Sequence, residues 1–100
     1  MECYAVIENC QEGIEPENGF AAILGLFLID PADGGKSALV KAEECLCAAW
    51  EKAKAGKSGS GPFESGNPPE RNDDGMLEAE WVCSGNDTAH FLDVRKQEIS

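Results

Sequence analysis

The chain has 100 residues, 42% of them hydrophobic, and a formal net charge of -11 from 19 acidic and 8 basic side chains. This length predicts one domain over residues 1–100, and the excess of acids disfavours nucleic acid and anionic membranes as partners, because both bind clustered lysine and arginine. Five cysteines, an odd number, and Glu2 where a secretory leader would carry a base favour reduced thiols in a cytoplasmic protein.

The first thirty residues predict two strands. CYAVIENC, residues 3–10, is aromatic and β-branched on alternating faces, which is typical of a strand, and Asn18-Gly19 then forms a turn. The apolar run 20–29 predicts a central strand covered on both faces, with a buried helix as the alternative that periodicity cannot separate over ten residues. Gly25 within this run predicts a bulge or a close backbone approach.

DPADGGKS, residues 30–37, matches the closing half of a phosphate-binding loop. Asp30 stands where the first glycine of such a loop would be, and Pro31 removes one of the N–H groups that would face phosphate. We therefore expect a turn over residues 30–34 that reverses the chain as a hairpin, and no nucleotide or other cofactor.

The hairpin places a third strand over residues 36–42, with the start of a helix as the alternative. A helix is expected over residues 43–56, because acids open it and lysines and Gly56 close it, in the order that complements the helix dipole. Its apolar residues at helical spacing, expected to face the sheet, are Leu46, Ala49, Trp50 and Ala53.

Cys45 and Cys47 within that helix resemble half of a zinc site. Two residues apart on a helix they point to nearly opposite sides, so packing explains them better than a shared metal ion.

Residues 56–75 are rich in glycine, proline and serine and predict a flexible loop, either a spacer or a segment that orders on binding through Phe63, its one aromatic residue. A strand over residues 77–83 follows, with apolar residues alternating against glutamates, and then a turn at 84–87. A last strand runs through Phe91, Leu92 and Val94 before a polar tail. The prediction is an α+β fold, an antiparallel sheet of about five strands with one helix on one face, in the order β-β-β-α-β-β.

Three stretches carry a family resemblance: CYAVI at the start, ALVKAEECLCAAWEKA in the middle, and Trp81 with HFLDV near the end. They resemble small bacterial domains of unknown function that begin on a Tyr-Ala-Val strand and end on a Leu-Asp-Val strand. The resemblance implies the fold and no activity.

The sequence favours a non-enzymatic protein-binding or inhibitory module that meets a basic partner. Clustered acids steer such a partner, and the candidate interaction residues are Glu78, Glu80, Asp73, Asp74 and Phe63. No catalytic, cofactor-binding or metal-binding residue is assigned. Because one helix leaves a face of the sheet partly bare, we also expect a homodimer through that face.

The alternative function is a small thiol-dependent enzyme or redox sensor that uses Cys83 or Cys3 with His90, the one histidine. His90 itself is expected to be a half-exposed strand residue, and no third group that would orient it is evident.

Overall fold

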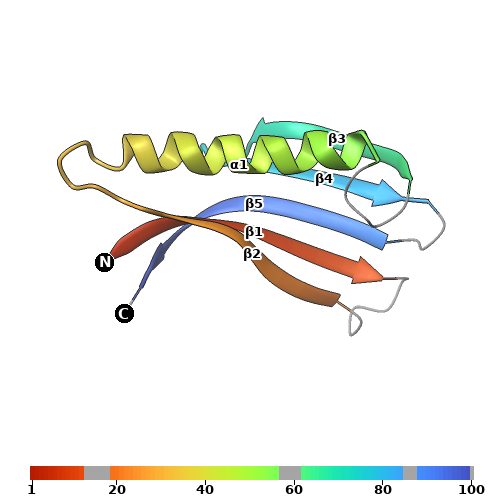
Figure 1. Ribbon diagram of the computed structural model, residues 1–100, viewed down its shortest axis with the longest axis horizontal. Coiled ribbons are helices and arrows are strands. Elements are labelled where there is room, and N and C mark those ends of the chain that lie inside the picture. The colour runs from red at the N-terminus through yellow and green to blue at the C-terminus, as the bar shows by residue number, and fades with distance from the viewer. Residues whose placement is uncertain (13–18, 57–61, 85–87, 100) are drawn as a thin grey trace.

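The computed structural model describes residues 1–12, 19–56, 62–84 and 88–99. In these ranges the elements are β1 (Glu2–Glu12), β2 (Gly19–Leu28), α1 (Lys36–Lys54), β3 (Phe63–Arg71), β4 (Leu77–Cys83) and β5 (Thr88–Glu98). The strands form one antiparallel sheet in the order β2-β1-β5-β4-β3, and α1 lies across one face of it (Figure 1). The predicted α+β class, with five antiparallel strands and one helix, is confirmed; the observed order is β-β-α-β-β-β.

The helix begins seven residues earlier than predicted, so the third strand over residues 36–42 is wrong, and so is the hairpin that led to it. The helix extends to the earlier residues because a stripe of buried residues, spaced three or four positions apart, begins with two alanines and continues into the predicted helix. Its members are Ala38, Ala42, Leu46, Trp50 and Ala53, all of which are buried against the sheet.

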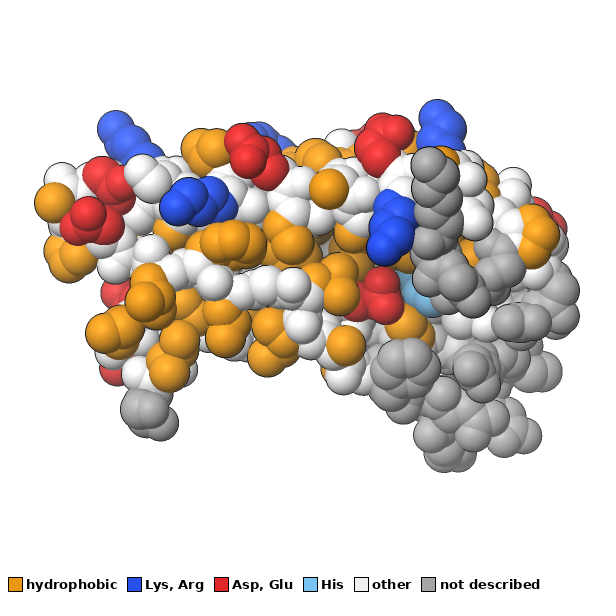
Figure 2. Space-filling view, viewed as in Figure 1, with side chains coloured by type: hydrophobic (Ala, Val, Ile, Leu, Met, Phe, Trp, Pro, Cys, Tyr) orange, Lys and Arg blue, Asp and Glu red, His pale blue; other side chains and the backbone are white. Residues whose placement is uncertain are grey.

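The predicted strands at both ends of the chain are confirmed, and β5 continues through the expected polar tail because β1 pairs with it as far as Glu98. β2 is a strand, but at the edge of the sheet and not at its centre. Its register against β1 shifts just beside Gly25, between the pairs Val6–Gly25 and Ile7–Ile23, so of the two predictions made for Gly25 the bulge is confirmed. Figure 2 shows hydrophobic side chains in a band along β2, below the helix.

The expectation of a flexible loop over residues 56–75 is wrong for residues 63–71, which form the edge strand β3; residues 57–61 lie outside the described ranges. Pro68 and Pro69 fall in an irregularity of the β3–β4 register, where a residue without an N–H breaks no ladder hydrogen bond. α1 therefore carries the chain from one edge of the sheet to the other. Of the predicted turn at 84–87, the described part is Ser84, which is in a turn.

The core lies between α1 and the sheet and is closed by aromatic residues of both layers. Trp50 of α1 donates a hydrogen bond from its indole N–H to the carbonyl of Glu80, 3.3 Å away, and Phe63 meets the Trp50 ring edge-on at 5.9 Å. Phe63 is thus part of the packing on the helix side of the sheet.

Candidate functional site

In the turn before α1, the main-chain N–H groups that could bind an anion are already bound by the carboxylate of Asp33. The main-chain N–H of Asp33 donates to Asp30 O at 3.2 Å, which confirms a turn in residues 30–34, and Gly35, with φ at 86°, then sends the chain into the helix. The Asp33 carboxylate accepts hydrogen bonds from the N–H of Gly35 at 2.8 Å, the N–H of Ser37 at 3.3 Å and the Ser37 hydroxyl at 2.6 Å. These donors at a helix N-terminus are the ones that would hold phosphate, so an anion would have to displace Asp33.

The same contacts give Asp33 a pH-dependent role in stability. The Ser37 hydroxyl, followed by the Gly35 N–H, lowers the pKa of Asp33 below its ordinary 3.8. A lowered folded-state pKa means that the stabilisation is complete above the unfolded-state value and is lost as the pH falls through the folded-state value. We expect Asp33→Asn, which keeps an acceptor but no charge, to unfold at a lower urea concentration than the wild type at neutral pH, with the gap closing in strong acid.

The control for this series is Glu44→Gln, which removes an equal charge from an exposed side chain further along α1. The difference in urea midpoint between Glu44→Gln and the wild type should not vary with pH in the way expected for Asp33→Asn. A gap between wild type and Asp33→Asn that stayed constant from neutral to strongly acidic pH would contradict the role given to Asp33.

Cys45 and Cys47 are half-buried on α1. Burial raises the pKa of both thiols, and the carboxylates of Glu43 and Glu51 raise the pKa of Cys47 further. Because the thiolate, not the thiol, attacks electrophiles, these two cysteines are poorly suited to act as nucleophiles. Packing remains the better explanation of both.

His90 is buried, not half-exposed as the sequence suggested, with 4% of its surface accessible. Its ring stacks on Trp81, with centroids 4.8 Å apart and planes at 8°. Its Nδ1 lies 3.2 Å from the Sγ of Cys10, the residue opposite it on β1. Cys3 and Cys83, the thiols that the alternative function assigns to His90, are completely buried, and Cys3 lies on the other face of β1.

Glu8 joins Cys10 and His90 in one polar group on the helix side of the two central strands. The Cys10 thiol donates to Glu8 Oε2 at 3.1 Å, and the same oxygen is 3.8 Å from His90 Nδ1. Burial lowers the pKa of His90, with Glu8 acting in the opposite direction, so the imidazole is neutral at pH 7. Since Cys10 is only 3% exposed, this arrangement is better suited to holding a small ligand than to attacking a substrate.

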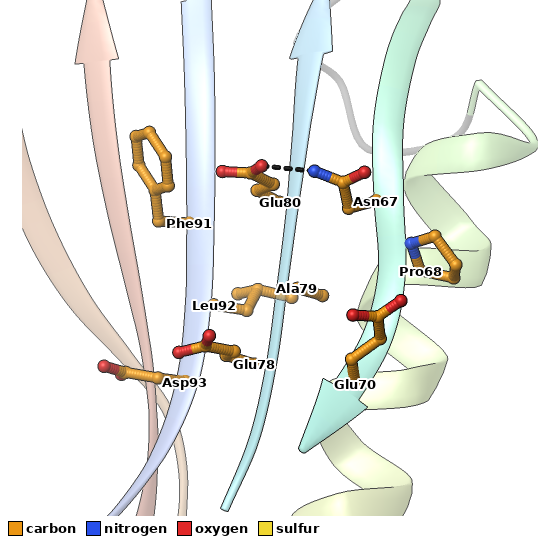
Figure 3. Close-up of a pocket in the computed structure, with 9 residues that line it drawn as sticks. All are labelled: Asn67, Pro68, Glu70, Glu78, Ala79, Glu80, Phe91, Leu92 and Asp93. Atoms are coloured by element: carbon orange, nitrogen blue, oxygen red, sulfur yellow. Dashed lines mark hydrogen bonds between the residues drawn. The ribbon is translucent and has the colours of Figure 1, made fainter. Parts of the chain in front are cut away.

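The opposite face of the sheet carries the acidic side chains. A hollow of about 280 Å³ over β3, β4 and β5 is lined by four carboxylates together with apolar residues (Figure 3). The carboxylates belong to Glu70, Glu78, Glu80 and Asp93. Glu80 accepts a hydrogen bond from the side-chain amide of Asn67, which fixes one end of the group.

Three of these acids stand directly opposite one another in the strand register. Glu78 of β4 is paired with Glu70 of β3 on one side and with Asp93 of β5 on the other. Like charges at directly opposite positions destabilise a sheet. Within the described ranges one base touches this row, because Arg95 Nε lies 2.9 Å from Asp93 Oδ2. The other oxygen, Asp93 Oδ1, is buried and has no hydrogen-bond partner among the described residues.

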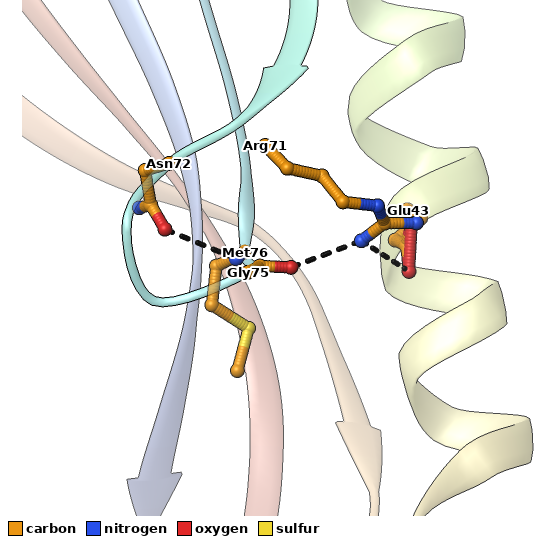
Figure 4. Close-up of polar contacts among 5 residues, drawn as sticks. All are labelled: Glu43, Arg71, Asn72, Gly75 and Met76. Atoms are coloured by element: carbon orange, nitrogen blue, oxygen red, sulfur yellow. Dashed lines mark hydrogen bonds and ion pairs between the residues drawn. The ribbon is translucent and has the colours of Figure 1, made fainter.

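Asp73 and Asp74 lie apart from the lining of this hollow, in the exposed turn between β3 and β4. Arg71 at the start of that turn does not neutralise the acidic row, because its guanidinium binds Glu43 of α1 at 2.8 Å and the carbonyl of Gly75 at 3.0 Å (Figure 4). The structure therefore gathers Glu78 and Glu80 of the predicted interaction residues into one place, with Asp73 and Asp74 at the turn and Phe63 on the other face.

Sequence reasoning missed four residues of the two groups: Glu8, Cys10, Glu70 and Asp93. Glu8 and Cys10 are two apart on one strand and share a face, which a period of two could have shown. Their meeting with His90 depends on the pairing of β1 with β5, the first and last strands, and no local pattern reports that pairing. Glu70 has no predicted neighbour, because the sequence predicts a loop where the structure has β3.

In comparisons with known proteins, no family model, curated protein or solved structure matches this chain. Within the described ranges, no helix has both the length and the apolar character needed to span a membrane.

Proposed function

We propose that the protein is a non-enzymatic binding or inhibitory module, and that the acidic face formed by β3, β4 and β5 receives a basic segment of a partner protein. The observation that carries this proposal is the cross-strand row Glu70–Glu78–Asp93. Such a row lowers the stability of the isolated protein, and a cation placed over it would remove that cost.

Two features beside the row support an arginine-rich or lysine-rich partner. Asp93 Oδ1 is a buried acceptor for which the described residues supply no donor, so the cost of this unpaired oxygen adds to the charge conflict that a cation over the row would relieve. Phe91 lines the same hollow and is 42% exposed, which leaves an aromatic face for a cation. The net charge of -11 would steer a basic partner towards this surface.

The test uses a short fluorescent arginine-rich peptide as the probe and Glu78→Gln as the variant. Glu78 is the middle member of the row, so its loss should weaken binding of the peptide several-fold at low ionic strength, measured by fluorescence anisotropy. Added salt should weaken peptide binding to the wild type and reduce the difference in affinity between the wild type and Glu78→Gln, because salt screens exposed charges.

The matched control is Glu51→Gln, which makes the same change in net charge at an exposed position on α1, on the opposite side of the sheet. It should weaken peptide binding much less than Glu78→Gln does. Equal weakening by both variants would show that the peptide responds to net charge alone. That result would contradict the proposal that the acidic face is the binding surface.

We further propose that the occupant of the β2 edge is a second copy of this chain. β2, with the sequence GFAAILGLFL, holds no charged residue and no proline, and among the described strands it pairs with β1 alone. Its Ile23, Leu26 and Leu28 are exposed on the face turned away from the helix. The other edge, β3, is protected by Pro68 and Pro69, so β2 is the edge suited to pairing. An uncharged edge also lets two acidic chains meet without repulsion at the contact.

A further inference from the structure

We propose that Glu8, Cys10 and His90 form a site for a divalent transition-metal ion such as Zn²⁺, held between the central strands β1 and β5. The site lies on the helix side of the sheet, so it is separate from the acidic face and does not depend on the function proposed for that face. It goes beyond the expectation of no metal-binding residue that the sequence alone supports.

The first argument is the choice of donor atoms. A thiol sulfur, an imidazole nitrogen and a carboxylate oxygen are the three donor types from which zinc sites are built. The ligating atoms of Glu8, Cys10 and His90 all lie within 4.8 Å of one another. Among the described residues this is the one group of at least three histidine, cysteine or acidic side chains that meets such a spacing.

The second argument is the size of the triangle that the three atoms make. Bonds of about 2.0–2.3 Å at tetrahedral angles place neighbouring ligand atoms about 3.3–3.6 Å apart. Here Cys10 Sγ is 3.1 Å from Glu8 Oε2 and 3.2 Å from His90 Nδ1, and the oxygen and nitrogen are 3.8 Å apart. Rotamer adjustments of a few tenths of an ångström therefore convert a hydrogen-bonded triangle into a coordination triangle.

The third argument is that the ligands are held in place. Cys10 and His90 are directly opposite each other in the β1–β5 register, and Glu8 follows on the same face of β1. The flat stacking of His90 on Trp81 fixes the imidazole plane. A site on paired central strands is more precisely positioned than one on loops, so little ordering is left for the ion to impose.

The experiment titrates the reduced, metal-free full chain with Zn²⁺ and, in parallel, with Co²⁺. We expect one equivalent to bind, a rise in melting temperature with Zn²⁺, and a cobalt–thiolate absorption band in the near ultraviolet. Cys10→Ser, nearly isosteric, should lose that band, and His90→Gln should weaken Zn²⁺ binding by more than the roughly 10–100-fold that outer-shell changes cost.

Cys47→Ser is the control, because it removes a half-exposed thiol outside the group. It should bind Zn²⁺ and Co²⁺ as the wild type does. The proposal is overturned if the wild type binds no metal ion at micromolar concentrations, if the cobalt band survives in Cys10→Ser, or if Cys47→Ser is the variant that loses it. Far-ultraviolet circular dichroism of each variant shows whether a loss of binding comes from a folded chain.

Discussion

Replacing Leu46 with alanine is expected to destabilise the protein by about 2–5 kcal/mol, the usual range for a large-to-small change in a closed core. Leu46 is completely buried at the middle of the stripe with which α1 covers the sheet. The helix is the only described element that covers this face, so the cavity left by the substitution cannot be filled from a second layer. Urea unfolding followed by tryptophan fluorescence, with Trp50 and Trp81 on either side of the core, measures the loss.

Val40→Ala is the matched control on the same helix, since Val40 is 54% exposed. It should change stability by no more than about 0.5 kcal/mol, as most surface substitutions do. If the two variants were equally stable, α1 would not pack on the sheet through the stripe that includes Leu46.

Replacing Leu26 with lysine is expected to convert a dimer into a monomer. Leu26 is 48% exposed on the open edge strand, two residues before its end, so the folded monomer has room for the longer side chain. In a symmetric pair of β2 strands each chain would place its lysine in the contact, so a charge of one sign would be introduced there twice. Sedimentation velocity of the wild type and Leu26→Lys over a range of concentrations measures the change.

Val40→Lys places the same charge on an exposed aliphatic position of α1, outside the β2 strand, and should leave the proposed dimer intact. A wild type that sediments as a monomer at high concentration would contradict the proposed role of β2. A Leu26→Lys variant that still dimerises would show that the dimer forms through another surface and not through β2.

The fold could be predicted from the sequence wherever one element carried its own periodicity. β4 was the clearest case, because Leu77, Ala79, Trp81 and Cys83 alternate with glutamates and the structure buries all four. The wrong prediction of a strand over residues 36–42 arose because a turn that begins with Asp30-Pro31 can lead either into a hairpin or into a helix. Gly35, with its positive φ, redirects the chain there, and the stripe that distinguishes the two outcomes begins with small alanines.

The error at β3 has a different cause. FESGNPPER contains almost none of the residues that favour strands, and its pairing with β4 is a tertiary effect that tolerates prolines because it lies at an edge and is irregular in register. Once β3 is missed, Glu70 has no predicted neighbour. The sequence could therefore suggest that Glu78 and Glu80 share a wet face, but not that Glu78 stands between two further acids.

The row Glu70–Glu78–Asp93 sets like charges directly opposite one another, and in the function proposed above a basic partner relieves this conflict. Proteins retain destabilising arrangements where binding uses them, and replacing such residues commonly raises stability while it lowers function. The opposite half of the same cross-strand row is apolar: Ile7 pairs with Asp93 on one side and with Ile23 on the other. Under the functions proposed above, the apolar edge of this face would meet a second copy and its acidic half would meet a basic partner.

The most direct test of the acidic face measures the free energy of unfolding of wild type and Glu78→Gln at low ionic strength, with and without the arginine-rich peptide. Without peptide, Glu78→Gln should be more stable by about 0.2–1 kcal/mol, because it removes two like-charge pairs. With peptide, the wild type should gain more stability than the variant and the difference should shrink or reverse. A Glu78→Gln variant that is less stable alone, or that gains as much from the peptide as the wild type does, would contradict the account.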